Sequence, residues 1–163
     1  FGEGGAMAQH ALASGSAAFA AVASVAGPLY SAPGSAVDRP ILLLYGLDDP
    51  TNPEAGGPIY TPWGGPADRP SLSQQIAAWR LALGCAQRPG AFQTEGPVRR
   101  ESWTACGQNG ALSAIFVAGL GRHWPGVGPG PLPPRVTGPA SDVIFAPWEI
   151  WRFVESRRNP TQR

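Results

Sequence analysis

The residues best suited to chemistry lie in three short segments, each at the junction of a predicted strand with a turn or loop. The first is the turn Gly2-Glu3-Gly4-Gly5, which runs straight into a helix. The second, Asp48-Asp49-Pro50, follows a buried apolar run, and the third, Gly121-Arg122-His123, follows the last predicted strand. A turn, an acid and a histidine in this order match the nucleophile, acid and base of one kind of acyl-transfer triad. Each segment alone is a weak signal, but their order and placement together favour a hydrolytic site.

Alternating strand-like and helix-like segments must position these residues. The strand-like segments are apolar runs at Phe19–Ala26, Ile41–Tyr45 and Ala111–Val117. The helix-like segments are Gly4–Ala13, Ser71–Gly84 and the stretch that starts at Pro147. Such alternation is typical of an α/β fold with a parallel sheet and right-handed crossovers. Two long Gly/Pro loops, Pro50–Pro70 and Pro125–Pro139, follow strand ends, where open parallel sheets place their ligand sites.

Composition excludes several classes of function. The 12 basic residues are all Arg, are scattered along 163 residues and are balanced by 11 acids, so nucleic acid is not an expected partner. No apolar run approaches the roughly 18–20 residues that cross a bilayer, so we expect no membrane span. The Gly-rich turn has Met7 where a dinucleotide-binding motif needs a third glycine, and no cofactor is expected.

The two cysteines, Cys85 and Cys106, match no metal-ligand spacing, so no metal site is expected. If they pair, they close a loop of about 20 residues, which would stabilise the fold by roughly 3 kcal/mol. A disulfide would also indicate an oxidising compartment. The alternative is a pair of buried free thiols.

Across nearly the whole chain, the pattern resembles the C-terminal half of the polyhydroxybutyrate depolymerase and feruloyl-esterase-like group of α/β-hydrolases. That group reads Gly-x-Ser-x-Gly-Gly-x-Met at the nucleophile turn, then His-Gly-x-x-Asp after a strand, and later Gly-x-Gly-His-x-Trp-Pro-Gly. The matching segments are Glu3-Gly4-Gly5-Ala6-Met7, Phe19-Ala20-Ala21-Val22-Ala23, Gly46-Leu47-Asp48-Asp49, Trp79 with Gly84-Cys85, Cys106 and Trp124-Pro125-Gly126. The resemblance implies a secreted or periplasmic serine esterase in which the two cysteines form a disulfide.

The departures from this pattern fall on the catalytic positions. In the family's register, the nucleophilic serine falls on Gly2 and the catalytic histidine on Arg122, while Asp49 keeps the acid. Glycine has no atom that can attack a carbonyl, and arginine cannot release a proton near neutral pH. We therefore expect the chain as written not to run the acyl-enzyme reaction. His123 is a possible substitute base, and the Glu3 backbone N–H would be one oxyanion donor.

Each of these residues also has a purely structural interpretation. The glycine-rich turn could be only a tight turn or a phosphate cradle, and Asp49 could belong to a turn or a helix cap. Arg122 could be solvated, or could pair with Asp49 and close the site. The loop aromatics Tyr60, Trp63 and Trp124 could form a substrate wall or merely pack their loops.

The family register carries expectations for the domain and its function. Residues 1–163 would be the C-terminal portion of a single α/β-hydrolase domain, a partial fold that lacks the N-terminal strands and the oxyanion loop. Its partners would be that missing half and a small or polymeric ester. The principal hypothesis is a carboxylic-ester hydrolase made inactive by Gly2 and Arg122. The alternatives are a non-catalytic protein that binds polyester, aryl ester or polysaccharide, and a degenerate fragment.

Overall fold

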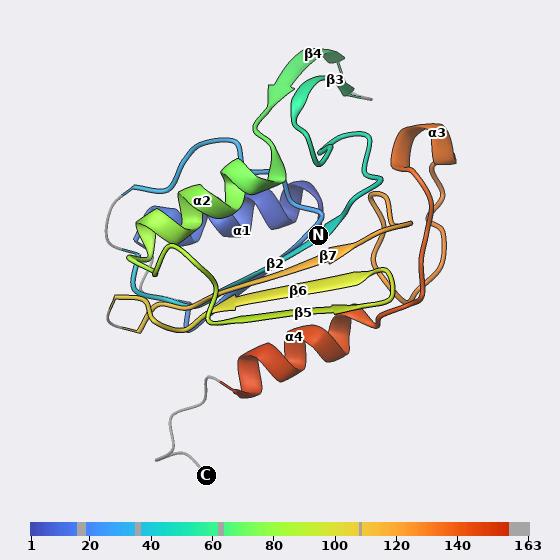
Figure 1. The fold of residues 1–163 in the computed structure, drawn as a ribbon. Helices are drawn as coiled ribbons and strands as arrows, with labels where there is room; N and C mark the ends of the chain where they lie inside the picture. The colour runs from blue at the N-terminus through green and yellow to red at the C-terminus, as the bar shows by residue number, and fades with distance from the viewer. Residues whose placement is uncertain (16–18, 35–36, 62–63, 108, 157–163) are drawn as a thin grey trace.

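The computed structural model describes residues 1–15, 19–34, 37–61, 64–107 and 109–156, and these form helices on both faces of one main sheet (Figure 1). The helices are α1 (Glu3–Ala13), α2 (Leu72–Ala82), α3 (Pro134–Thr137) and α4 (Ala146–Glu155). The strands are β1 (Val22–Val25), β2 (Ile41–Gly46), β3 (Gly57–Thr61), β4 (Gly64–Arg69), β5 (Ala91–Glu95), β6 (Val98–Trp103) and β7 (Leu112–Val117). The expectation of an α/β fold is confirmed at this level.

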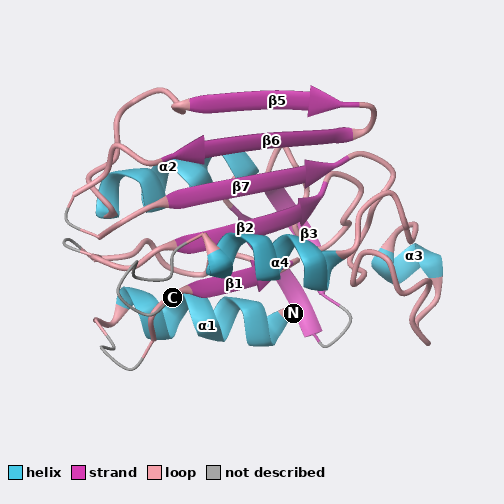
Figure 2. Ribbon diagram, turned by 90° about the horizontal axis from the view of Figure 1, so that it is seen from below, coloured by secondary structure: helices cyan, strands magenta, loops and turns pink. Residues whose placement is uncertain are grey.

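The main sheet has five strands in the order β1-β2-β7-β6-β5, as Figure 2 shows. Strands β1, β2 and β7 run parallel, whereas β6 and β5 run antiparallel to their neighbours. Every residue of β2 is buried, because this strand lies inside the sheet with both of its faces covered. The apolar runs therefore form parallel strands as expected.

Two hydrophobic clusters lie on opposite faces of the sheet. Leu43 and Tyr45 of β2 point into the cluster under α1 and α2, where Trp79 is completely buried. Leu42 and Leu44 point the other way, into the cluster under α4. Figure 1 shows α1 and α2 together on one face and α4 on the other. The alternation along β2 thus joins three helices to one sheet.

Helix α1 approaches the sheet closely because glycine lies at the contact. A Cβ atom on Gly5 would lie 2.7 Å from Ser24 Oγ, and one on Gly27 would lie 2.7 Å from the Gly5 backbone. Because real Cβ atoms do not come this close, any side chain here would push α1 away from β1. This contact fixes the start of α1 relative to the parallel strands.

Helix α2 begins as the sequence predicts. Ser71 Oγ accepts a hydrogen bond from the Gln74 backbone N–H, and the Gln74 side chain accepts one from the Ser71 N–H. The helix ends before Gly84, which has a φ of +62°. The capping box is therefore confirmed.

Two antiparallel hairpins depart from the expectation of parallel strands and long irregular loops. The segment Pro50–Pro70 contains the β3–β4 hairpin, and β5–β6 extends the main sheet. The segment Pro125–Pro139 contains the short helix α3. In β4 the sequence is rich in Gly and Pro, and all five residues of β5 are exposed, so neither strand carries an apolar alternation. Backbone pairing rather than side-chain pattern defines these strands.

A disulfide joins Cys85, just after α2, to Cys106, just after β6. The pairing is therefore confirmed, and it ties a helix on one face of the sheet to the antiparallel strands. It is consistent with an oxidising, extracytoplasmic compartment. In the part of the chain that the structure describes, no helix is long and apolar enough to cross a membrane.

Replacing both cysteines in a Cys85→Ser/Cys106→Ser variant should lower the free energy of unfolding by about 3 kcal/mol, because the closed loop spans 21 positions in the chain. Urea denaturation followed by circular dichroism measures this difference. A reducing agent should lower the urea midpoint of the natural protein and leave that of the variant unchanged. Equal midpoints for oxidised and reduced natural protein would contradict the prediction.

Candidate functional site

The candidate site lies at the edge of the sheet where the parallel strands end. Both ribbon views place the N-terminus, α3 and the ends of β2 and β7 at this edge (Figures 1 and 2). In open parallel sheets this edge is where ligands bind. The three segments singled out in the sequence therefore meet at the edge of the sheet where open α/β folds place their ligand sites.

Gly2 forms a sharp turn directly before α1, with φ of 56° and ψ of −127°. Residues with a side chain rarely adopt a positive φ, so the turn is strained for anything but glycine. The Gly2 N–H donates a 2.9 Å hydrogen bond to the Val25 carbonyl, which ties the turn to the end of β1. A strained turn into a helix is the geometry that presents a nucleophile in hydrolases of this fold class.

The Arg122 guanidinium lies directly against this turn. A Cβ atom on Gly2 would be 2.9 Å from Arg122 Nη2, so the two positions face each other. The loop that carries Arg122 is held by α3, since the Arg122 N–H bonds to the Thr137 carbonyl. Gly121 permits this approach, because a Cβ there would lie 2.0 Å from the Thr137 oxygen. Positions 2 and 122 are thus adjacent, as nucleophile and base must be.

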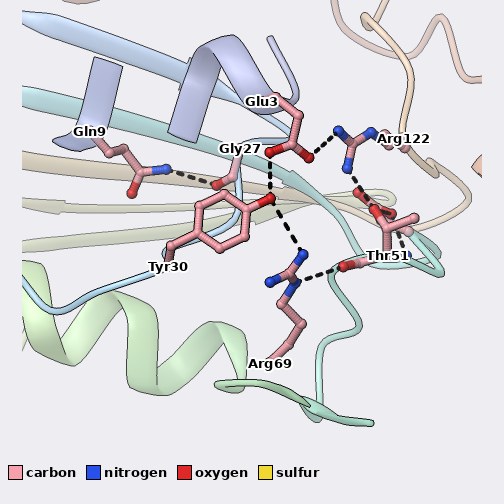
Figure 3. A network of polar contacts seen from close by, with 8 residues as sticks. Glu3, Gln9, Gly27, Tyr30, Thr51, Arg69 and Arg122 are labelled. Carbon is pink, nitrogen blue, oxygen red and sulfur yellow. Dashed lines mark hydrogen bonds and ion pairs between the residues drawn. The ribbon is translucent and has the colours of Figure 1, made fainter. Parts of the chain in front are cut away.

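A chain of hydrogen bonds links Arg122 to Asp49 through Thr51, and Figure 3 shows the contact between Arg122 and Thr51. Arg122 Nη1 donates to Thr51 Oγ1 at 2.8 Å. The Thr51 hydroxyl and N–H both donate to Asp49 Oδ1, at 2.7 and 2.8 Å. Arg122 and Asp49 are therefore connected indirectly and make no direct ion pair. Thr51 was not predicted, although the spacing from Asp49 is that of an Asx turn.

Asp49 is 2% exposed, and its Oδ2 has no hydrogen-bond partner among the described residues. Burial raises the pKa of Asp49, while the Thr51 hydrogen bonds and the Arg122 charge act in the opposite direction. Asp48 has a different task, since its carboxylate accepts a 2.7 Å hydrogen bond from the Gly119 N–H. Only the second acid of the pair thus faces the site.

The Asp49→Asn variant should be more stable than the natural protein at pH 7, because it removes a buried charge and keeps the acceptor for Thr51. Asp49 has a raised pKa, so its contribution to stability is greatest below the unfolded pKa and declines as pH rises through the folded value. The advantage of the variant should therefore shrink at pH 4. Urea unfolding at both pH values tests this, with exposed Asp48→Asn as the matched control. An advantage that grows at pH 4 would contradict it.

His123 is buried in the loop beyond Arg122. Its Nε2 lies 3.0 Å from the Gly138 carbonyl, and its Nδ1 accepts from the Gly130 N–H at 3.4 Å. Both ring nitrogens therefore contact loop backbone. To act as a base beside Asp49, the ring would have to break both contacts.

Of the three aromatic residues predicted as a substrate wall, the structure describes Tyr60 and Trp124. Tyr60 of β3 is 84% exposed. Trp124 is half-buried and packs edge-on against Phe1, with the ring centroids 6.0 Å apart. Trp124 therefore lies next to the turn at Gly2. Trp63 lies outside the described residues.

A second guanidinium, that of Arg69 at the end of β4, was missed from the sequence. Arg69 Nε donates to the Thr51 carbonyl at 3.3 Å, and its guanidinium lies 4.6 Å from the centre of the Tyr30 ring. The Tyr30 hydroxyl donates to Glu3 Oε2, and Arg122 Nη2 donates to Glu3 Oε1 at 3.0 Å. Figure 3 shows Glu3 between Tyr30 and Arg122. No local pattern in the sequence signals these contacts, because they join distant segments.

The Glu3 carboxylate is held in its charged form. Burial alone would raise its pKa, but hydrogen bonds from Tyr30 and Arg122, with the positive charges of Arg122 and Arg69, keep that pKa below its usual value. The Tyr30 pKa is raised, by burial and by the neighbouring Glu3. The site therefore contains one charged carboxylate between a phenol and an arginine.

Beside this network lies a cavity of about 250 Å³. Glu3 and Tyr30 border both the network and the cavity, whose apolar lining comes from Ala6, Met7 and Leu29. In the part of the chain that the structure describes, no group of three His, Cys, Asp or Glu side chains is placed to hold a metal ion.

Comparisons of the chain with protein-family models, with curated proteins and with solved structures found no match. The fold and the site define an α/β protein with a sharp strand-to-helix turn at a glycine, an arginine facing that turn and a buried acid linked to the arginine through Thr51. Interpretation of this arrangement therefore depends on the chemistry of these residues.

Proposed function

We propose that this chain is built on the scaffold of a secreted carboxylic-ester hydrolase, similar to polyhydroxybutyrate depolymerases and feruloyl esterases, whose site no longer turns over esters. The observation that carries the proposal is the adjacency of Gly2 and Arg122, with the unpartnered Asp49 Oδ2 buried behind them. These are the relative places of nucleophile, base and acid in an acyl-transfer triad.

The chemistry of the present residues explains the loss of turnover. Gly2 offers no oxygen to attack an ester carbonyl, and the Arg122 guanidinium stays protonated and cannot accept a proton. What remains is an acceptor, Asp49 Oδ2, which is buried without a hydrogen-bond partner among the described residues, and a histidine Nδ1–H at position 122 would need such an acceptor. The Glu3 N–H at the start of α1 remains as a donor for a developing oxyanion.

A second candidate function is ligand binding without turnover. The observation that favours it is that Arg122 is engaged by both Glu3 and Thr51 and is only 14% exposed in its side chain. These contacts hold the Arg122 guanidinium within the site, and a guanidinium is a donor that suits carboxylate ligands. Ester hydrolysis and ligand binding therefore need separate measurements.

The test is hydrolysis of p-nitrophenyl butyrate by the full chain as it occurs, beside a Gly2→Ser/Arg122→His double variant. We expect the natural chain to be inactive and the double variant to be active and sensitive to a serine-directed inhibitor. A double variant that folds but does not hydrolyse the ester would contradict the proposal.

A further inference from the structure

An arginine and a tyrosine hold a carboxylate that belongs to an exposed side chain. Arg122 donates to one oxygen of Glu3 at 3.0 Å, and Tyr30, which carries Arg69 over its ring, donates to the other. Arg69 is 8% exposed and the Arg122 side chain 14%, whereas the Glu3 side chain is 52% exposed. Arg122 is thus held in place, whereas Tyr30, which is 57% exposed, and Glu3 lie at the surface, so the Glu3 carboxylate is free to rotate into solvent.

The charges around the position favour an anion even without Glu3. Arg122 and Arg69 are both anchored on Thr51, at its hydroxyl and its carbonyl. Helix α1, 11 residues long, begins at Gly2 with no side-chain cap, so its first amide groups also point positive charge at this end. The remaining acid, Asp49, is on the far side of Thr51, and burial disfavours its charged form.

The neighbouring cavity sets the shape of a ligand. It measures about 250 Å³, and its apolar side is formed by Ala6, Met7 and Leu29. Glu3 and Tyr30 line this cavity, so a group that replaces the Glu3 carboxylate on Tyr30 lies next to the apolar space. A molecule with a carboxylate at one end and a few carbon atoms at the other fits both parts.

We propose that this site binds the carboxylate of a short-chain organic acid, with Glu3 occupying the carboxylate position until the ligand displaces it. The ligand carboxylate accepts from Arg122 and Tyr30, as Glu3 does, and its alkyl chain lies against Ala6, Met7 and Leu29. A planar carboxylate is favoured over other anions because Glu3 itself places one oxygen on each donor. This inference adds a ligand class to the site described under the proposed function. It rests on the proposed function only for the choice of that site.

The experiment is an NMR titration of the full chain with butyrate, and with methyl butyrate as the uncharged probe. The Glu3→Gln variant removes the competing charge and should bind butyrate at least about tenfold more tightly than the natural chain, which corresponds to about 1.4 kcal/mol. Methyl butyrate should show no such gain. Adding Arg122→Met to Glu3→Gln should abolish the gain.

The matched control is Glu54→Gln, which removes the same charge from a half-exposed carboxylate that pairs with Arg99 rather than with Arg122 or Tyr30. It should leave butyrate affinity unchanged. Equal gains in Glu3→Gln and Glu54→Gln, or a gain that survives Arg122→Met in a variant with a natural urea midpoint, would overturn the inference. Because these measurements use no ester turnover, an inactive Gly2→Ser/Arg122→His variant would count against the proposed function and leave the carboxylate site standing.

Discussion

The Gly2→Ser/Arg122→His double variant is expected to hydrolyse p-nitrophenyl butyrate at least about 10³-fold faster than the natural chain. The reason is geometric, because a side chain at position 2 points at position 122, whose present guanidinium is 2.9 Å from the place of its Cβ. A histidine is shorter than arginine and relieves this crowding. The second ring nitrogen of this histidine then needs an acceptor. Asp49 Oδ2 is buried without a hydrogen-bond partner among the described residues, whereas the Asp48 carboxylate already accepts from the Gly119 N–H.

Each half of the double variant alone should stay inactive. Gly2→Ser alone adds a nucleophile but leaves a guanidinium that cannot take its proton, and Arg122→His alone adds a base with nothing to activate. Serine at the positive φ of position 2 is strained by about 1–3 kcal/mol. The hydrogen bond from the N–H of residue 2 to the Val25 carbonyl and the packing of α1 must hold the turn in its present conformation despite this strain. Thermal unfolding of the variants shows whether they do.

Asp49 supplies the matched control for this experiment. Adding Asp49→Asn to the active double variant should return its rate close to that of the natural chain, a drop of about 10³-fold, because an amide no longer orients and stabilises the charged imidazole. Turnover by the natural chain that resists a serine-directed inhibitor would place the chemistry on other residues. Equal rates with and without Asp49→Asn would exclude Asp49 from the reaction.

The elements with strong local signals could be predicted from the sequence. The apolar run Ile41–Tyr45 forms a buried parallel strand, and the capping box of Ser71 and Gln74 starts its helix. The adjacency of Gly2 and Arg122 follows from the family register, which counts positions from glycines and a Trp-Pro-Gly segment. Local periodicity and motif spacing carry this information.

Contacts between distant segments could not be predicted in the same way. The Arg69 contact with Tyr30 joins residues 39 positions apart, and Arg122 meets Thr51 across 71 positions. Arg69 reaches the site only because the β3–β4 hairpin folds back, and that hairpin has Gly and Pro where strand-forming residues are expected. These contacts of Arg69 and Arg122 could therefore not be predicted before the fold was known.

Trp79→Ala should lower the free energy of unfolding by about 3–5 kcal/mol. Trp79 of α2 is fully buried against the sheet, and its Nε1 donates to Gln9 Oε1 of α1 at 2.8 Å. The Gln9 amide in turn donates to Ser24 Oγ and to the Gly27 carbonyl. The substitution therefore opens a large cavity and leaves a buried amide oxygen without its donor, and both effects are destabilising.

Two further variants separate these effects. Trp79→Phe keeps most of the apolar volume and loses only the N–H, so it should cost less than the alanine substitution. Trp148→Ala in α4 removes an indole that is 56% exposed and should change the unfolding free energy by well under half as much.

Because Gln9 lies one to two turns from Gly2 on the same helix, the loss of its anchor should also loosen the start of α1. Urea unfolding gives the free energies, and hydrogen exchange of the α1 amides measures the loosening. Equal losses of unfolding free energy for Trp79→Ala and Trp148→Ala would show that α2 does not hold α1 in place.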